Sequence, residues 1–115
     1  MVGIATENGY TEILPGIRIK TLCYGEAMLM SEFLLEKGAL LPSHEHPYEQ
    51  TGYLVKGNIK LTIGEVSRNI LPGYSWSIPA GVSHFAEILT DSVAIEVFSP
   101  AREDYLKFLN QEDIR

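Results

Sequence analysis

Apolar and polar residues alternate in short runs over most of the chain. A period of two residues is typical of β-strands with one buried face. Glycine and proline separate the runs about every eight to twelve residues, which predicts an antiparallel sandwich or barrel of many short strands. The expected strands are 17–22, 27–36, a histidine-bearing stretch after Gly38, 51–56, 59–63, 66–71, 74–78, 84–89 and 92–98.

Turns and chain ends complete this all-β prediction. Gly57-Asn58 and Gly64-Glu65 are each expected to form a tight hairpin turn. Residues 1–15 show no sustained period and are expected to form an N-terminal arm that pairs with another strand or subunit. The segment 101–110 instead places Leu106 and Leu109 three residues apart, which predicts a short C-terminal helix that caps the barrel.

Length and charge limit the possible partners. The chain has 115 residues, enough for one domain spanning 1–115 and too few for a second independent core. Its net charge is −6, and its nine Lys and Arg residues are spread thinly. Because nucleic-acid binding needs a basic surface that neutralises phosphates, we do not expect a nucleic-acid partner.

The distribution of apolar residues also bears on location. No apolar run approaches the roughly 20 residues that cross a bilayer, and the N-terminus lacks a basic region followed by an apolar one. We therefore expect no membrane partner and a cytoplasmic location. Cys23 is the only cysteine, which fits a reducing compartment, and a small buried side chain is its expected role.

The three histidines of the chain are the candidate metal ligands. His44 and His46 are one residue apart, so in an extended strand both side chains point to the same side. His84 follows a Pro/Gly turn later in the chain. A single histidine is more often structural, but three histidines with a carboxylate or amide nearby favour a metal site.

Two residues compete for the fourth ligand position. Glu49 carries charge and is the better donor to a hard divalent ion. Gln50 has the same parity as His44 and His46, so continuous extension places it on their face. Pro47 could shift the register, so the pattern leaves both residues open and favours Gln50.

These residues resemble the two sequence motifs of the cupin superfamily. The first is Gly38-x5-His44-x-His46-x3-Gln50-x6-Gly57, and the second is Gly73-x5-Pro79-x-Gly81-x2-His84. Gln50 stands where the first motif usually has Glu, and Ile88 where the second usually ends in Asn. The resemblance implies a small antiparallel jelly-roll barrel, a homodimer and one bound metal.

A narrower resemblance is to the KdgF-type cupins of pectin and alginate breakdown. It rests on the runs 44–50, 52–53, 78–82 and 97–105. The resemblance implies a metal-dependent enzyme that converts a 4,5-unsaturated monouronate, or a similar small acidic sugar, to its linear keto form. The Gln is a ligand in that group, so the implied metal ligands are His44, His46, Gln50 and His84.

The same resemblance assigns the substrate pocket to residues farther along the chain. Arg102 would bind the uronate carboxylate through its planar fork, and Phe98 would line the pocket. Glu96, which stands where the group has Asp, shares a face with Phe98 by parity and could act as general acid or base. A rim carboxylate or an ion pair with Arg102 is an equal alternative for Glu96. Tyr53 would supply a second apolar wall.

Several alternatives remain open at this level. The ligands suit zinc, nickel, cobalt, iron, copper or manganese. Other small-cupin enzymes, such as an iron-dependent oxygenase or a sugar isomerase, share the expected fold, and so does a non-catalytic metal- or sugar-binding module. Trp76 lies in an expected strand and is interpreted as a core or interface residue rather than a platform on which a sugar stacks.

Overall fold

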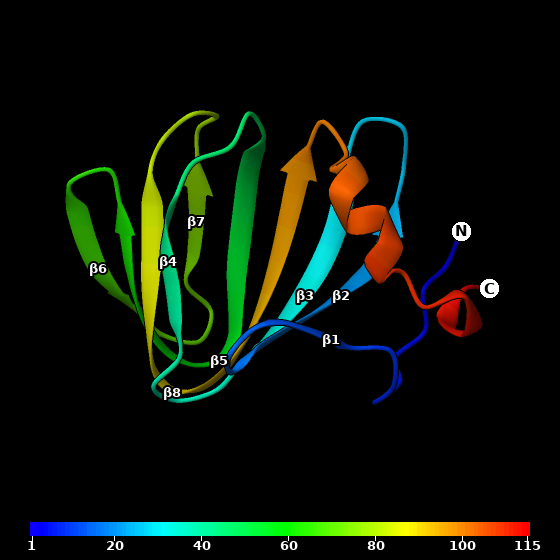
Figure 1. Ribbon diagram of the computed structural model, residues 1–115, viewed down its shortest axis with the longest axis horizontal. Coiled ribbons are helices and arrows are strands. Elements are labelled where there is room, and N and C mark those ends of the chain that lie inside the picture. Colours follow the sequence, from blue (N-terminus) through cyan, green and yellow to red (C-terminus); the bar gives the residue numbers. More distant parts are fainter.

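The computed structural model describes residues 1–115 as eight antiparallel strands and two short 3-10 helices (Figure 1). The all-β prediction is confirmed. The strands are β1 (Thr11–Leu14), β2 (Ile17–Tyr24), β3 (Leu29–Leu35), β4 (Leu40–His44), β5 (Glu49–Ile63), β6 (Val66–Ile70), β7 (Ser75–Ile78) and β8 (His84–Ser99), and the 3-10 helices are η1 (Glu103–Phe108) and η2 (Gln111–Asp113).

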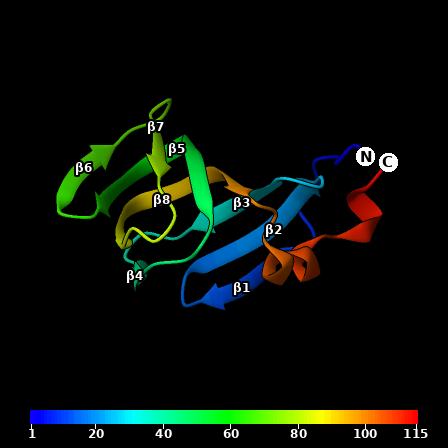
Figure 2. The ribbon, with the colours of Figure 1, turned by 90° about the horizontal axis from the view of Figure 1, so that it is seen from above.

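Two long strands, β5 and β8, organise the barrel. They pair along their whole lengths, from Glu49 opposite Ser99 to Ile63 opposite His84. On its other edge β5 pairs first with β7 and then with β6, while β8 pairs first with β4 and then with β3. One half of the barrel is therefore β1-β2-β3-β8-β5-β7 and the other is β4-β8-β5-β6, as Figures 1 and 2 show.

The predicted hairpin at Gly57-Asn58 is wrong, because β5 runs through this point. The β5–β8 register shifts here, and Gly57 has a φ of 103°. A Cβ on Gly57 would lie 2.0 Å from Ser92 Oγ, which also accepts a hydrogen bond of 3.1 Å from the Asn58 N–H. Gly57 is thus an irregularity inside a continuous strand, where only glycine leaves room for the Ser92 side chain.

Other expected boundaries also change. Segments 84–89 and 92–98 form the single strand β8, so the polar residues between them interrupt the pattern but not the strand. The turn at Gly64-Glu65 is confirmed, since it joins β5 to β6. The helix expected over 101–110 is instead the tighter η1, followed by η2.

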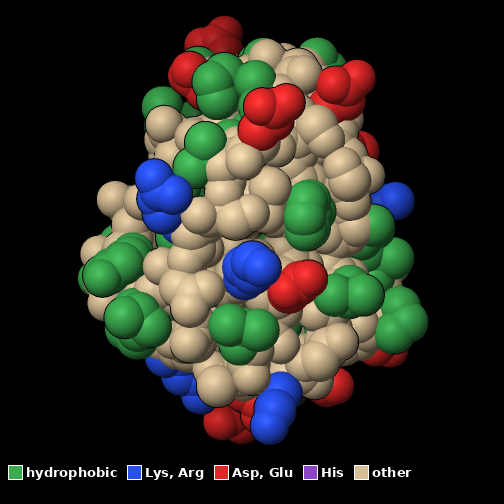
Figure 3. Space-filling view, turned by 90° about the vertical axis from the view of Figure 1, so that its left-hand side faces the viewer, with side chains coloured by type: hydrophobic (Ala, Val, Ile, Leu, Met, Phe, Trp, Pro, Cys, Tyr) green, Lys and Arg blue, Asp and Glu red, His purple; other side chains and the backbone are tan.

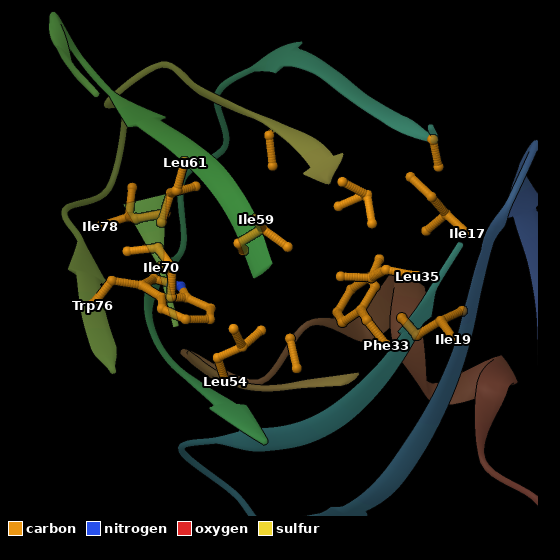
Figure 4. Close-up of a cluster of buried hydrophobic side chains, with 14 residues drawn as sticks. Ile17, Ile19, Phe33, Leu35, Leu54, Ile59, Leu61, Ile70, Trp76 and Ile78 are labelled. Carbon is orange, nitrogen blue, oxygen red and sulfur yellow. The ribbon is translucent and has the colours of Figure 1, made fainter. Parts of the chain in front are cut away.

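The apolar core fills the space between the two halves of the barrel. Figure 4 shows its side chains converging from opposite sides, with Ile17, Ile19 and Phe33 facing Ile59 and Ile78. Trp76 packs in the same cluster, so its predicted core role is confirmed.

Both chain ends lie together beside β2 (Figures 1 and 2). The Val2 N–H donates to the Arg115 carbonyl oxygen over 2.8 Å, and Gly3 bridges Ile114. Residues 1–15 are expected to pair with another strand or with a second subunit. β1 lies in this segment and pairs with β2, so pairing with another strand is confirmed.

The side of the molecule nearest β6 faces the viewer in Figure 3 and carries charged side chains of both signs among apolar ones. On β6 itself, Val66 is an exposed apolar residue. None of the helices is long or apolar enough to cross a membrane.

Candidate metal centre

Three histidines meet at the end of the barrel where β4 finishes and β8 begins. His44 and His84 are direct register partners on those strands. His46 lies just after β4, where its carbonyl oxygen accepts a hydrogen bond of 2.8 Å from the Gly81 N–H. One ring nitrogen from each histidine lies within 4.8 Å of the others, a spacing that allows all three to bind one ion.

Backbone carbonyls fix the same tautomer in all three rings. The Nδ1 atoms of His44, His46 and His84 lie 2.8, 3.0 and 2.9 Å from the carbonyl oxygens of Pro42, Tyr48 and Val82. A carbonyl oxygen only accepts, so each Nδ1 carries the proton and each Nε2 keeps a lone pair. This backbone support is the arrangement that orients histidine ligands in metal sites.

Gln50 lines the same cavity as the three histidines, and Glu49 does not. Along β5 the Gln50 side chain is buried toward the inside, while the neighbouring Glu49 is exposed on the outer face. The Gln50 Nε2 donates a hydrogen bond of 2.7 Å to Glu96 Oε2, which leaves Oε1 as the free end of the amide.

Two buried atoms of the proposed ligands lack a hydrogen-bond partner. They are Gln50 Oε1 and His46 Nε2. An unpaired buried polar atom costs about 1–3 kcal/mol, so native sites generally satisfy such atoms. An amide oxygen and imidazole nitrogens are also ligands that divalent transition metals accept, so these residues fit a metal ion.

Burial keeps two of the imidazoles neutral. It lowers the pKa of His46, an effect that the neighbouring Gln50 side chain partly opposes and the charge of Arg102 reinforces. Burial also lowers the pKa of His84, although the Val82 carbonyl opposes it. Neutral imidazole is the form that binds a metal, so the site does not have to lose protons from these rings at neutral pH.

Glu96 lies on the inner face of β8, beside Gln50. Burial raises the pKa of its carboxyl group to about 8, and the hydrogen bond from Gln50 only partly offsets the effect. Glu96 forms no ion pair with Arg102, which pairs with Asp104 instead. The alternative prediction, an ion pair between Glu96 and Arg102, is therefore wrong.

Arg102 follows β8 and reaches the same cavity through an aromatic cluster. Its guanidinium carbon lies 3.7 Å from the ring centroid of Tyr105, 4.9 Å from that of Phe98 and 5.0 Å from that of Tyr48. Its Nε and Nη2 donate to the two carboxylate oxygens of Asp104 over 3.1 and 2.7 Å. The guanidinium is thus held in one orientation, and Asp104 accepts from only some of its N–H donors.

The structure brings together all the expected site residues except Tyr53. One cavity is lined by the three histidines, Gln50, Glu96, Phe98 and Arg102. Tyr53 lies on the outer face of β5 and is 49% exposed. Its odd spacing from Gln50 already places it on the opposite face of the strand, so parity was the signal against it.

Sequence reasoning missed three residues around the cavity. Asp104 and Tyr105 hold Arg102, and Trp76 lines the cavity from β7. Asp104 and Tyr105 follow Arg102 closely in the sequence, so their proximity was the available signal. Nothing in the local pattern around Trp76 indicates that its indole extends to the site.

Comparison with known proteins identifies the fold. Residues 31–99 match the family model of the cupin domain. KdgF from Halomonas sp. is 28% identical, with a TM-score of 0.86 over 90% of this chain and 96% of that one. An RmlC-like cupin from Shewanella frigidimarina is 29% identical, with a TM-score of 0.80 over 84% of this chain and 86% of that one.

More distant structures share only the fold. Oxalate decarboxylase from Bacillus subtilis is 21% identical, with a TM-score of 0.69 over 74% of this chain and 26% of that one. No curated protein matches the chain significantly.

Proposed function

The chain belongs to the cupin domain family, and from this premise we propose that it is a metal-dependent enzyme acting on a 4,5-unsaturated monouronate or a similar small acidic sugar. The reaction would be conversion of the cyclic sugar to its linear keto form. The similarity to KdgF from Halomonas sp. over nearly the whole of both chains supports this choice within a family that hosts many reactions.

One observation carries the proposal. The unpaired Gln50 Oε1 and His46 Nε2 lie in the same cavity as two other groups. These are the buried Glu96 carboxyl group and the Arg102 guanidinium, which packs on aromatic rings. A cavity with metal ligands, a proton-transfer group and a carboxylate-binding group has the parts that this reaction needs. His44, His46, His84 and Gln50 would hold one divalent transition metal.

The bound metal would supply Lewis acidity toward substrate oxygens. Because all four ligands are neutral, they leave the ion its full positive charge. Arg102 would bind the uronate carboxylate with the donors that Asp104 leaves free. Phe98, 2% exposed, would exclude water from one side of the sugar.

Glu96 would move the proton. Overall, a proton leaves the anomeric hydroxyl and a proton arrives at C4, while the bond between C1 and the ring oxygen breaks and C5 becomes a ketone. This is an isomerisation, so it requires no oxidant or co-reactant. The Glu96 carboxyl is placed beside the proposed ligand Gln50, where one group can accept the first proton and donate the second.

The proposal is tested by metal loading followed by an absorbance assay. The metal-free protein is loaded separately with zinc, nickel, cobalt, iron, copper or manganese and mixed with unsaturated galacturonate or guluronate. Opening of the ring removes the double bond conjugated to the carboxylate, so ultraviolet absorbance should fall faster than in the spontaneous reaction. No acceleration with any of these metals would contradict the enzymatic proposal, and tight sugar binding without turnover would favour a binding module.

Other expectations stay predictions. These are the homodimer, the cytoplasmic location and the extent of one domain over 1–115. Light scattering on the purified protein would measure the oligomeric state.

A further inference from the structure

Trp76 lies across the inner face of β5, directly over Gly52. A Cβ on Gly52 would lie 2.1 Å from Cε2 and 2.3 Å from Nε1 of the Trp76 indole. No side chain can occupy that space while the indole is there. Gly52 is thus required for close approach of the indole, and its absence of a side chain lets Trp76 extend from β7 across β5.

The residue on the far side of Gly52 is Glu96. Gly52 is the register partner of Trp76 on β7 and of Glu96 on β8, so the three residues form one row across the sheet. Since paired residues point to the same face, the indole and the carboxylate meet above Gly52. Both also line the same cavity.

The indole N–H in this row lacks an acceptor. Trp76 is only 9% exposed, and its Nε1 is buried without a hydrogen-bond partner. Glu96 Oε2 accepts from Gln50 Nε2, and that is the only hydrogen bond of this carboxylate, so Oε1 remains available. Trp76 is also among the groups that favour the charged form of Glu96 and lower its pKa.

We propose that Trp76 is a positioning residue whose indole N–H donates to the Glu96 carboxylate. Together with the Gln50 amide it holds the carboxylate by two donors that face it from neighbouring strands. Catalytic hydrogen bonds often tighten only when substrate binds, which accounts for a buried N–H that is still without a partner. The effect on turnover rests on the proposed function, whereas the hydrogen bond does not.

The hydrogen bond is tested without any activity measurement. Trp76 is the only tryptophan, so the full-length protein gives one indole N–H signal in a proton–nitrogen correlation spectrum. Glu96→Gln replaces the carboxyl group with an amide and should shift the indole proton. Glu87→Gln removes a carboxylate on the same strand that does not line the cavity and should leave the signal in place. An indole signal that is unchanged in Glu96→Gln would overturn the proposal.

The positioning role is tested by kinetics on the metal-loaded protein. Trp76→Phe keeps an aromatic ring but removes the donor, so kcat should fall roughly ten- to hundredfold while KM and metal content stay near wild type. Gly52→Ala should have a similar effect, because the added Cβ displaces the indole. Wild-type kcat in Trp76→Phe would overturn the positioning role. If the wild-type protein has no activity with any metal, the proposed function fails, and the indole signal still decides whether the hydrogen bond exists.

Discussion

Gln50 Nε2 donates a hydrogen bond of 2.7 Å to Glu96 Oε2, and this contact sets the orientation of the Gln50 amide. With its nitrogen committed to the carboxylate, the amide presents Oε1 as its free atom. The Glu96 carboxylate thus has a structural effect on the proposed metal site even though it is not one of the proposed ligands.

Metal retention should differ between a variant of the proposed ligand His44 and a variant of Glu96, which is not a proposed ligand. His44→Ala removes one of three converging imidazoles, so the variant should not retain metal. Glu96→Ala removes no proposed ligand, so it should lose much less metal than His44→Ala, even though Gln50 loses its hydrogen-bond partner. Elemental analysis after dialysis against a weak chelator measures both. Equal loss from the two variants would contradict the assignment of Glu96 to proton transfer.

Arg102→Lys should weaken substrate binding. Lysine has a point charge in place of the planar fork that pairs with Asp104 and packs on Tyr105, so it cannot reproduce this geometry. We expect KM for an unsaturated uronate to rise roughly tenfold, with metal content unchanged. Arg68→Lys on β6 is the control, because Arg68 is exposed and lies outside the cavity. An unchanged KM in Arg102→Lys would exclude the role proposed for Arg102.

Local sequence patterns predicted most of the residues of the candidate metal site but not its surroundings. The alternation along one strand was enough to place Gln50 inside and Glu49 outside. The path of β5 through Gly57 depends on Ser92, a residue distant along the chain, and no local pattern contains that contact. The indole of Trp76 likewise reaches the site only because Gly52 lies beside it on another strand.

Gly57→Ala should destabilise the protein more than an ordinary glycine substitution. The new Cβ would contact Ser92, and alanine disfavours the φ of 103°. We expect a loss of about 2 kcal/mol or more in the free energy of unfolding, measured by urea denaturation. Gly25→Ala is a matched control, because its Cβ meets no atom within 4 Å and its φ is not positive. Similar stabilities for the two variants would mean that β5 does not need glycine at 57.

The buried Lys20–Asp113 ion pair should make part of the stability depend on pH. Lys20 Nζ lies 2.9 Å from Asp113 Oδ2 and also donates to the carbonyl oxygens of Thr6 and Asn8, so it ties both chain ends to β2. The hydrogen bond from Lys20 lowers the pKa of Asp113, and burial only partly opposes it. A lowered pKa in the folded state means that the contribution is complete above the unfolded value of about 3.9 and is lost as pH falls through the folded value.

The prediction is tested by comparing Asp113→Asn with wild type in a chelator, so that metal binding does not contribute. At pH 7 the variant should be clearly less stable, because Lys20 is then buried without its anionic partner. Below about pH 3.9 the unfolded wild-type chain binds a proton on Asp113 that the folded protein takes up only at lower pH, so the difference in urea midpoint between the two proteins should shrink as pH falls. Glu65→Gln, in the turn after β5, should differ little from wild type at either pH. A difference that stays constant or grows as pH falls would show that the ion pair is not the source of the stability.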